Sequence, residues 1–204
     1  MGLYTRFVLP RLLAAAMRQP DLVPFRASVG RAASGRVLEL GIGPALNLPF
    51  YGPDVTAVIG IDPSPQLLAM AERKRGGQAF EVQLIEGSAE RLPLDSGSID
   101  TVVTTWTLCT VPSAPQVLAE ARRVLKPGGK LLFAEHGRAP GEIVARWQDR
   151  LDPVWTRIAG GCHMNRPIAD HIVDAGFRMD EITTAYIAGP RVLTFMYSGC
   201  AMPT

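Results

Sequence analysis

The residues best suited to ligand chemistry lie in a short glycine-rich run near the start of the chain. Glu39 lies at the end of an apolar segment and is followed by Gly41 and Gly43. Asp62 closes the next apolar segment, about 20 residues further on. The glycines let a ligand approach the backbone where a Cβ would collide, and an acid at this spacing can accept hydrogen bonds from ribose hydroxyls. The pattern predicts a binding site for an adenosine-containing ligand.

The last position of the glycine-rich fingerprint, which is Leu46 here, distinguishes two classes of cofactor. A dinucleotide site has Gly or Ala at its third place, so that the helix packs closely and its N-terminus receives a pyrophosphate. Here Pro44 and Ala45 are followed by Leu46 at that place. S-adenosylmethionine (SAM) carries no phosphate and needs no such turn, so Leu46 favours SAM over NAD. We expect Glu39 to organise the site around the cationic amino-acid end of SAM, the alternative being a carboxylate that only closes a strand.

Candidate residues for the reaction itself lie further along the chain. His136 follows a later apolar segment, and we expect it to act as a general base; an orienting hydrogen bond involving Glu135 is the alternative. Cys109 and His163 lie close to expected ligand-binding loops, although a small buried cysteine and a surface histidine are the plainer interpretations. Cys162 precedes His163, but Cys109 and His136 are far away along the chain. This spacing gives no paired ligand motif, and we expect no metal site.

The elements that must position these residues follow from apolar periodicity. Five runs rich in β-branched residues predict strands covered on both faces, at 36–40, 55–61, 80–85, 99–105 and 130–134. Helical patterns separate them at 64–75 and 114–125, the second followed by an expected turn at 126–129. Beyond Glu135 we expect helices at 141–158 and 168–175, then strands at 178–185 and 192–197 that pair antiparallel at a sheet edge. The alternation predicts a parallel α/β sheet with right-handed crossovers.

Bulk properties restrict the class of protein. The 204 residues suit one domain, with an N-terminal segment at 1–30, a cofactor-binding core at 36–135 and an acceptor side at 136–204. The net charge of +2 and the lack of a basic stripe argue against a nucleic-acid partner. Three widely spaced cysteines indicate a reducing, cytoplasmic compartment rather than a disulfide framework. The sequence does not define an oligomeric state.

The N-terminal segment has two interpretations. Residues 7–17 are apolar and lie between Arg6 and Arg18, with Pro10 interrupting the run. We expect a basic amphipathic helix that acts as a lid. A weak contact with a membrane surface through residues 3–18 is the alternative, because arginines beside leucines suit an interfacial helix.

Four stretches with the right spacing resemble the class I SAM-dependent methyltransferases: VLELGIG, GIDPSPQLL, EGSAERLPLDSGSIDTVVTTWTL and EARRVLKPGGKLLFAEH. The resemblance covers roughly 36–135. It implies a Rossmann-like α/β fold, with a seven-stranded, mostly parallel sheet, helices on both faces and one antiparallel edge strand. It also implies SAM as cofactor, with S-adenosylhomocysteine as product. Ser88 departs from the family pattern, which commonly has an Asp there. The implied cofactor-binding residues are Glu39, Gly41, Gly43, Asp62, Pro63, Ser88, Ala89, Glu90 and Thr105.

A narrower resemblance concerns the acceptor. Residues 108–111, 135–136 and 151–155, followed by Gly161-Cys162 and Arg166, are similar to one branch of the family. That branch includes mammalian membrane-associated thiol S-methyltransferases and bacterial relatives, some labelled phospholipid methyltransferases. It implies methylation of a small, fairly apolar acceptor, with a thiol favoured. N-methylation of a phospholipid headgroup or another small amine is one alternative, and a non-catalytic SAM-binding protein is another. The implied acceptor-pocket residues are Cys109, His136, Trp155, His163 and Arg166.

Overall fold

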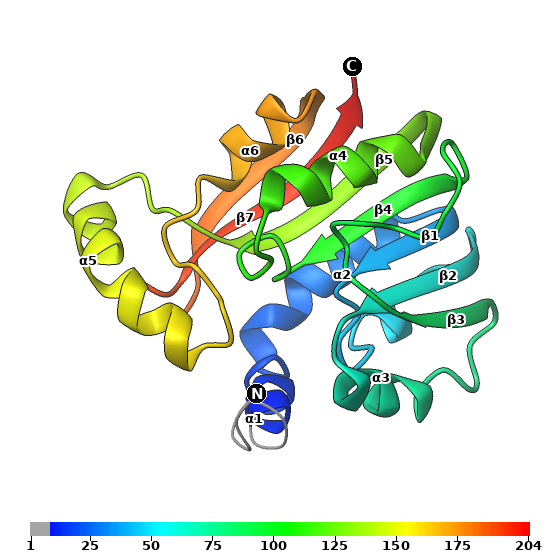
Figure 1. Cartoon of the computed structure of the whole chain (residues 1–204), viewed down its shortest axis with the longest axis horizontal. Coiled ribbons are helices and arrows are strands. Elements are labelled where there is room, and N and C mark those ends of the chain that lie inside the picture. The colour runs from blue at the N-terminus through cyan, green and yellow to red at the C-terminus, as the bar shows by residue number, and fades with distance from the viewer. Residues whose placement is uncertain (1–8) are drawn as a thin grey trace.

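A computed structural model describes residues 9–204. The chain forms one sheet of seven strands in the order β3-β2-β1-β4-β5-β7-β6 (Figure 1). The strands are β1 (Gly35–Leu40), β2 (Val55–Asp62), β3 (Glu81–Glu86), β4 (Ile99–Thr105), β5 (Leu125–His136), β6 (Phe177–Tyr186) and β7 (Phe195–Pro203). Strands β1 to β5 pair in parallel, and β7 runs antiparallel to both β5 and β6. The predicted Rossmann-like fold class is confirmed.

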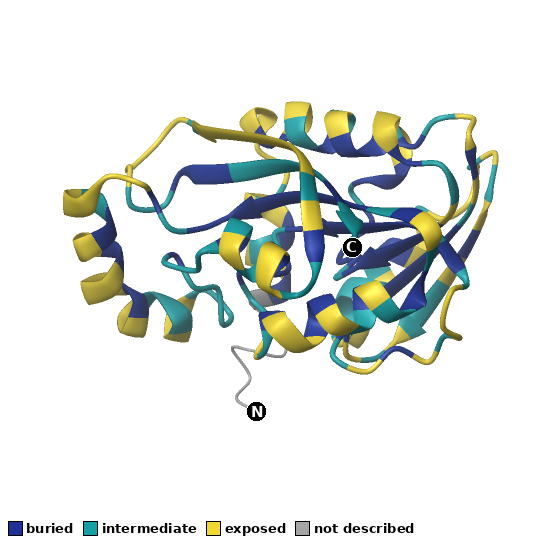
Figure 2. Cartoon of the chain, turned by 90° about the horizontal axis from the view of Figure 1, so that it is seen from above, coloured by how far each residue is buried: buried dark blue, intermediate teal, exposed yellow. Residues whose placement is uncertain are grey.

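Helices cover both faces of this sheet (Figures 1 and 2). The helices are α1 (Leu9–Ala16), α2 (Val23–Ala32), α3 (Pro65–Glu72), α4 (Ala114–Val124), α5 (Glu142–Ile158) and α6 (Ile168–Asp174), and η2 (Pro20–Leu22) and η3 (Leu48–Phe50) are short 3-10 turns. One apolar core packs α4 and α6 against the sheet, and a second packs α2 and α3 against it. Because each central strand contributes to both cores, its sequence is apolar on both faces.

Two helices begin directly after loops at the edge of the sheet where ligands are expected. The Ser64 hydroxyl accepts a hydrogen bond from the Leu67 N–H at the start of α3, and the Ser113 hydroxyl caps α4 in the same way through the Gln116 N–H. Pro65 occupies the first turn of α3, where its missing N–H has no partner to lose. These caps fix where the loops after β2 and β4 stop.

The structure differs from the sequence expectation at several places. Helix α3 ends at Glu72 rather than 75, and β7 extends to Pro203 rather than 197. The last strand starts at Phe195 rather than 192, because the Leu193 N–H and the Thr194 hydroxyl both bond to the Pro190 carbonyl and form a turn. The predicted antiparallel pair lies at the sheet edge, with β7 between β5 and β6. The turn expected at 126–129 is instead an irregularity within β5, where Gly128 has φ +78° and the register with β4 shifts.

The N-terminal segment is partly described. Residues 1–8, which include the start of the predicted lid or membrane-contact segment, lie outside the described residues. The remainder forms α1 and α2, and α1 lies beside α3 (Figure 1). Within residues 9–204, no helix has the length and apolarity needed to cross a membrane.

Candidate active site

The glycine-rich loop after β1 is tightly packed against the loop after β4. Gly41 has φ +65°, and a Cβ there would collide with the Thr107 hydroxyl. That hydroxyl donates to the Leu40 carbonyl at 2.9 Å, which joins the two loops. Ala45 also has a positive φ of +53°, a conformation that costs a non-glycine residue about 1 kcal/mol or more. The loop therefore presents backbone atoms without bulky side chains at the end of β1. A ligand can approach such a backbone closely.

Asp62 lies at the end of β2 and faces this loop. Its Oδ2 accepts a hydrogen bond from the Gly43 N–H at 2.9 Å, and its Oδ1 accepts one from the Ser64 N–H at 2.8 Å. Burial raises the pKa of Asp62, while the two backbone donors oppose that shift. Each oxygen keeps a free lone pair in a fixed direction. The carboxylate thus suits the two ribose hydroxyls of SAM, and the residues present fit the cofactor.

Glu39 is buried in a polar network that the sequence only partly indicated. Its carboxylate accepts hydrogen bonds from Asn47 Nδ2 at 2.8 Å and the Tyr51 hydroxyl at 2.7 Å. Asn47 also donates to Thr105 Oγ1 and accepts from Arg26 of α2. Burial raises the pKa of Glu39 to about 7, against the opposing effects of Tyr51 and Arg26. A cation bound beside Glu39 would favour its ionised form.

Arg26, Asn47 and Tyr51 were missed as site residues. Asn47 is a lone polar residue in an apolar stretch directly after the glycine loop, and this was a usable signal. Arg26 carries no local signal, because it reaches the site only when α2 folds over the end of β4. There its guanidinium lies 4.7 Å from the ring centre of Trp106.

The predicted adenine-side run follows β3. The Gly87 N–H donates to the Asp62 carbonyl, so the run starts beside Asp62. Ser88 is exposed and accepts from the Glu90 N–H, while the Glu90 carboxylate accepts from the Ser113 N–H before α4. These bonds shape the loop, and the individual contacts to adenine stay predictions. The structure brings the predicted cofactor residues to the adjacent ends of β1 to β4: Glu39, Gly41, Gly43, Asp62, Pro63, Ser88, Ala89, Glu90 and Thr105.

On the acceptor side, the buried carboxylate of Glu135 supports the loop after β4. It accepts hydrogen bonds from the Thr104 hydroxyl at 2.7 Å, from the Thr107 N–H at 3.0 Å and from the Cys109 N–H at 3.3 Å. Burial raises the pKa of Glu135, and these donors oppose the shift. Glu135 therefore holds the loop after β4 in place. Its neighbour His136 lies instead beside Cys162.

Cys109, His136 and Cys162 come together although they are far apart in sequence. The Cys162 sulfur lies 3.7 Å from the Cys109 sulfur and 3.7 Å from His136 Nδ1. The hydrogen bond between the two thiols and the nearby His136 lower the pKa of Cys162, whereas the pKa of Cys109 is raised by the same hydrogen bond and by burial. His136 stays a predicted base, and its Nε2 atom is buried without a hydrogen-bond partner in the described part of the chain.

His163 forms a carboxylate–imidazole pair with Asp152. His163 Nδ1 lies 2.7 Å from Asp152 Oδ2, and Asp152 Oδ1 accepts from the Met164 N–H at 2.8 Å. The backbone N–H of His163 donates to the Cys109 carbonyl at 2.7 Å, and this bond connects the pair to the loop after β4. A carboxylate on Nδ1 selects the tautomer that leaves Nε2 as proton acceptor. Asp152 was not predicted as a site residue, although an acid on the inner face of an amphipathic helix was a signal.

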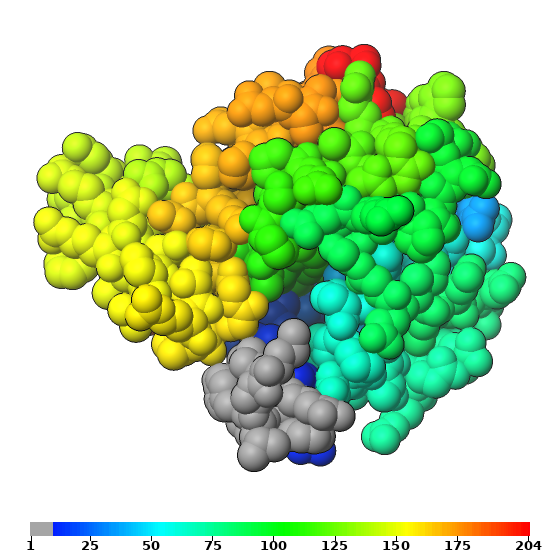
Figure 3. Space-filling view, in the orientation of Figure 1, coloured from blue at the N-terminus to red at the C-terminus, as the bar shows by residue number. Residues whose placement is uncertain are grey.

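Arg166 and Trp155 complete the acceptor side. Arg166 donates to the Leu108 carbonyl, and burial lowers the pKa of its guanidinium. The Trp155 Nε1 is buried without a hydrogen-bond partner among the described residues. On the face shown in Figure 3, the surface is hollowed between the green, cyan and yellow segments. The five predicted acceptor-pocket residues are assembled in one place, and their roles stay predictions: Cys109, His136, Trp155, His163 and Arg166.

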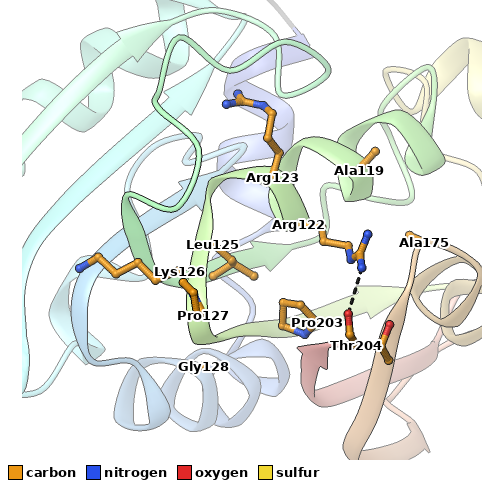
Figure 4. A pocket seen from close by; sticks show the side chains of 10 residues that line it. All are labelled: Ala119, Arg122, Arg123, Leu125, Lys126, Pro127, Gly128, Ala175, Pro203 and Thr204. Atoms are coloured by element: carbon orange, nitrogen blue, oxygen red, sulfur yellow. Dashed lines mark hydrogen bonds between the residues drawn. The ribbon is translucent and has the colours of Figure 1, made fainter.

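A separate hollow lies at the opposite edge of the sheet. It is formed by the end of α4, the start of β5 and the end of β7 (Figure 4). Its cations have partners: Arg123 pairs with Glu120, Lys126 pairs with Asp100, and Arg122 donates to the Thr204 carbonyl. The candidate active site lies at the other end of β5, so this hollow is no part of it.

Comparison with known families agrees with the fold. The family described as "Methyltransferase domain" matches residues 38–133. A solved SAM-dependent methyltransferase from Thermotoga maritima superposes with a TM-score of 0.67, covering 98% of this chain and 100% of that chain at 21% identity. The likeness at this identity concerns the fold alone. The family match, the paired glycines and Asp62 together support a class I SAM-dependent methyltransferase, with SAM as its cofactor.

Particular relatives extend the match beyond the cofactor half. The chain is 38% identical over 153 residues to the Homo sapiens thiol S-methyltransferase TMT1B, covering 71% of this chain and 62% of that protein. It is 37% identical over 117 residues to phosphatidylethanolamine N-methyltransferase of Cereibacter sphaeroides, covering 56% and 57%. The chain thus spans about six tenths of the length of these curated relatives.

Proposed function

We propose that the chain transfers the methyl group of SAM to the sulfur of a small, fairly apolar thiol. The observation that carries this proposal is the Asp152–His163 pair, tied through Cys109 to the loop that packs on the cofactor glycines. The thiol S-methyltransferases among its relatives support the same acceptor.

The residues of the acceptor side are sufficient for methylation of a thiol. SAM supplies a methyl group that is already activated on a sulfonium, so the protein mainly aligns the reactants and excludes water. A free thiol has a pKa of about 8.5, and a weak base is enough to ionise it near neutral pH. His163, oriented by Asp152, accepts that proton at Nε2.

A panel of small thiols, amines and phenols tests the proposal, with SAM present and product masses as the readout. We expect methylated thiols together with S-adenosylhomocysteine. Methylated amines without methylated thiols would contradict the proposed acceptor. The absence of any product, despite SAM binding by calorimetry, would indicate a non-catalytic SAM-binding protein.

N-methylation of a phospholipid headgroup is the second candidate, and helix α5 favours it. The outer face of α5 carries an exposed apolar stripe, while Asp152 lies on its inner face. Exposed apolar side chains beside arginines suit a lipid surface. The stripe residues are Ile143, Trp147, Leu151, Val154 and Ile158.

Liposome sedimentation separates the two candidates. Under the phospholipid hypothesis, Trp147→Glu abolishes binding to anionic vesicles and methylation of their headgroups. Under the thiol hypothesis, the same variant keeps its turnover of water-soluble thiols. Val173→Glu, an exposed apolar residue on α6, is the matched control.

A further inference from the structure

The strongest feature that the proposed function does not use is the cluster of Cys109, His136 and Cys162. The three side chains come from the loop after β4, the end of β5 and the loop after α5. One potential ligand atom from each residue lies within 4.8 Å of the others. The structure adds no fourth such ligand from residues 9–204.

The distances within the cluster match those around a tetrahedral zinc ion. With Zn–S bonds of about 2.3 Å and Zn–N bonds of about 2.0 Å, tetrahedral angles place two sulfurs about 3.8 Å apart and sulfur and nitrogen about 3.6 Å apart. The observed separations are 3.7 Å for the two sulfurs and 3.7 Å for Cys162 Sγ and His136 Nδ1. The ligand atoms of Cys109 and His136 lie within 4.8 Å of each other.

The nitrogen of His136 that faces the cluster is only weakly bonded. His136 is 6% exposed, and its Nδ1 has only the Cys162 sulfur as a partner among the described residues. A thiol is a weak hydrogen-bonding group, so a metal ion bound to Nδ1 would replace a weak contact with a strong one. A soft or borderline metal ion binds imidazole and thiolate together.

The backbone around the cluster is held in place before any ion binds. The Cys109 N–H donates to Glu135, and the Cys109 carbonyl accepts from the His163 N–H. Gly161 has φ +91°, which allows the chain to turn beside Thr110 and present Cys162. Glu135 and Arg166 are charged groups that act electrostatically on the cysteines. Two thiolates and a divalent cation add no net charge to this buried site.

We propose that Cys109, His136 and Cys162 bind a zinc-type divalent ion, with a fourth position left for the sulfur of the acceptor. Three protein ligands and one open position are the arrangement of catalytic rather than structural zinc sites. The proposal revises the expectation of no metal, which rested on spacing along the chain. Its second half, the acceptor as fourth ligand, rests on the proposed thiol methylation.

The ion would supply the charge that makes a thiol reactive. Ion binding releases the protons of Cys109 and Cys162. On coordination the acceptor thiol loses its proton to His163 or to water. Its sulfur lone pair then forms the bond to the methyl carbon, and the electrons of the broken methyl–sulfonium bond stay on the cofactor sulfur. The products are a thioether and S-adenosylhomocysteine.

Cobalt titration of the reduced, chelator-treated protein tests the site without any turnover. We expect one equivalent of Co²⁺ to bind, with thiolate-to-cobalt charge-transfer absorption and the visible bands of a tetrahedral ion, and we expect Zn²⁺ to displace it. Cys109→Ser and Cys162→Ser should lose the charge-transfer absorption or reduce it sharply. His136→Gln should weaken binding by more than the about 10- to 100-fold typical of removing a residue that supports a ligand. Cys200→Ser, on β7 outside the cluster, should leave it unchanged.

Each outcome decides between the hypotheses. Calorimetry with S-adenosylhomocysteine shows whether a variant is folded, so a loss of cobalt absorption with intact cofactor binding is specific to the cluster. No thiolate absorption in the reduced wild type, or equal absorption in Cys162→Ser, would overturn the metal site. A Cys109–Cys162 disulfide in the isolated protein, with no cobalt binding even after the disulfide is reduced, would also overturn it.

The open position has its own readout. Adding a small thiol such as 2-mercaptoethanol in the presence of S-adenosylhomocysteine should shift the visible cobalt bands, whereas ethanolamine should not. If the bands do not shift, the acceptor thiol is not the fourth ligand, and only that part of the proposal is overturned. A failure of thiol methylation in the acceptor panel would be visible separately, because cobalt binding does not depend on methyl transfer.

Discussion

The cofactor side and the acceptor side of this site are built in different ways. The cofactor side uses the ends of neighbouring parallel strands, where Glu39, the glycines and Asp62 follow one another closely in sequence. The acceptor side joins Cys109, His136, Asp152 and the 162–166 loop, which come from separate elements. In the first region local sequence determines the contacts, whereas in the second the tertiary fold brings them together. Substitutions should therefore separate cofactor binding from acceptor turnover.

The largest expected effect concerns the acceptor side alone. His163→Asn should lower kcat/KM for thiols by about 10²- to 10⁴-fold, the usual contribution of a positioned base, and leave the SAM Kd unchanged. The deficit should shrink as the pH approaches the thiol pKa of about 8.5, because the acceptor then ionises without help. Steady-state kinetics across pH, with calorimetry for SAM, provide both readouts.

His171 on α6, the third histidine, is the control for that experiment. His171→Asn should behave as wild type. A fall in SAM affinity equal to the fall in turnover of His163→Asn would show that the two sides are not separable.

The next effect concerns cofactor binding. Asp62→Ala should weaken SAM binding about 100-fold, because two hydrogen bonds to a charged group contribute about 1.5 kcal/mol or more each. Asp54→Ala, which removes an exposed carboxyl at the start of the same strand, should leave the Kd unchanged. Unchanged affinity of Asp62→Ala by calorimetry would mean that SAM binds elsewhere.

A third change affects the packing that links the two sides. Gly41→Ala should lower the free energy of unfolding by about 2 kcal/mol, because the residue has φ +65° and its Cβ would collide with Thr107. Gly76→Ala meets no atom within 4 Å and should be neutral. Urea unfolding of both variants checks the difference, and equal stability would show that the two loops are not tightly packed.

The smallest effect is a pH dependence of cofactor affinity. Burial raises the pKa of Glu39 to about 7, so the carboxyl is mostly protonated at pH 6 and mostly ionised at pH 8. SAM presents a cation, so its affinity should rise with pH by up to about tenfold across this interval. Glu39→Gln cannot ionise and should give a flat profile. A wild-type affinity that falls with rising pH would contradict the assignment.

The fold was largely predictable, because each central strand is a continuous apolar run and each crossover helix has local start and stop signals. Ser64-Pro65 marked the start of α3 within one residue. The start of β7 was misplaced because a turn around Pro190 displaced three β-branched or apolar residues from the strand. Sequence periodicity does not show such a turn.

The positions of candidate-site residues could be predicted where these residues follow strand ends. They could not be predicted where the residues come from other elements. Asp62 could be located from the glycines alone. Arg26 reaches the site from a helix that has no sequence link to it, whereas Asp152 lies in the 151–155 run that resembles the family branch but was not singled out as a site residue. The spacing along the chain argued against a metal, yet folding brings the potential ligand atoms of Cys109, His136 and Cys162 within 4.8 Å of one another, since two loops and the end of β5 meet there.

A competition between matched acceptors tests the central claim most directly. The protein, SAM with a trideuterated methyl group, and equal amounts of 2-mercaptoethanol and ethanolamine are combined, and the products are analysed by mass. If the acceptor is a thiol, we expect the label in the thioether, in equal amount with S-adenosylhomocysteine, and not in the amine. Label found in the methylated amine and not in the thioether would contradict it.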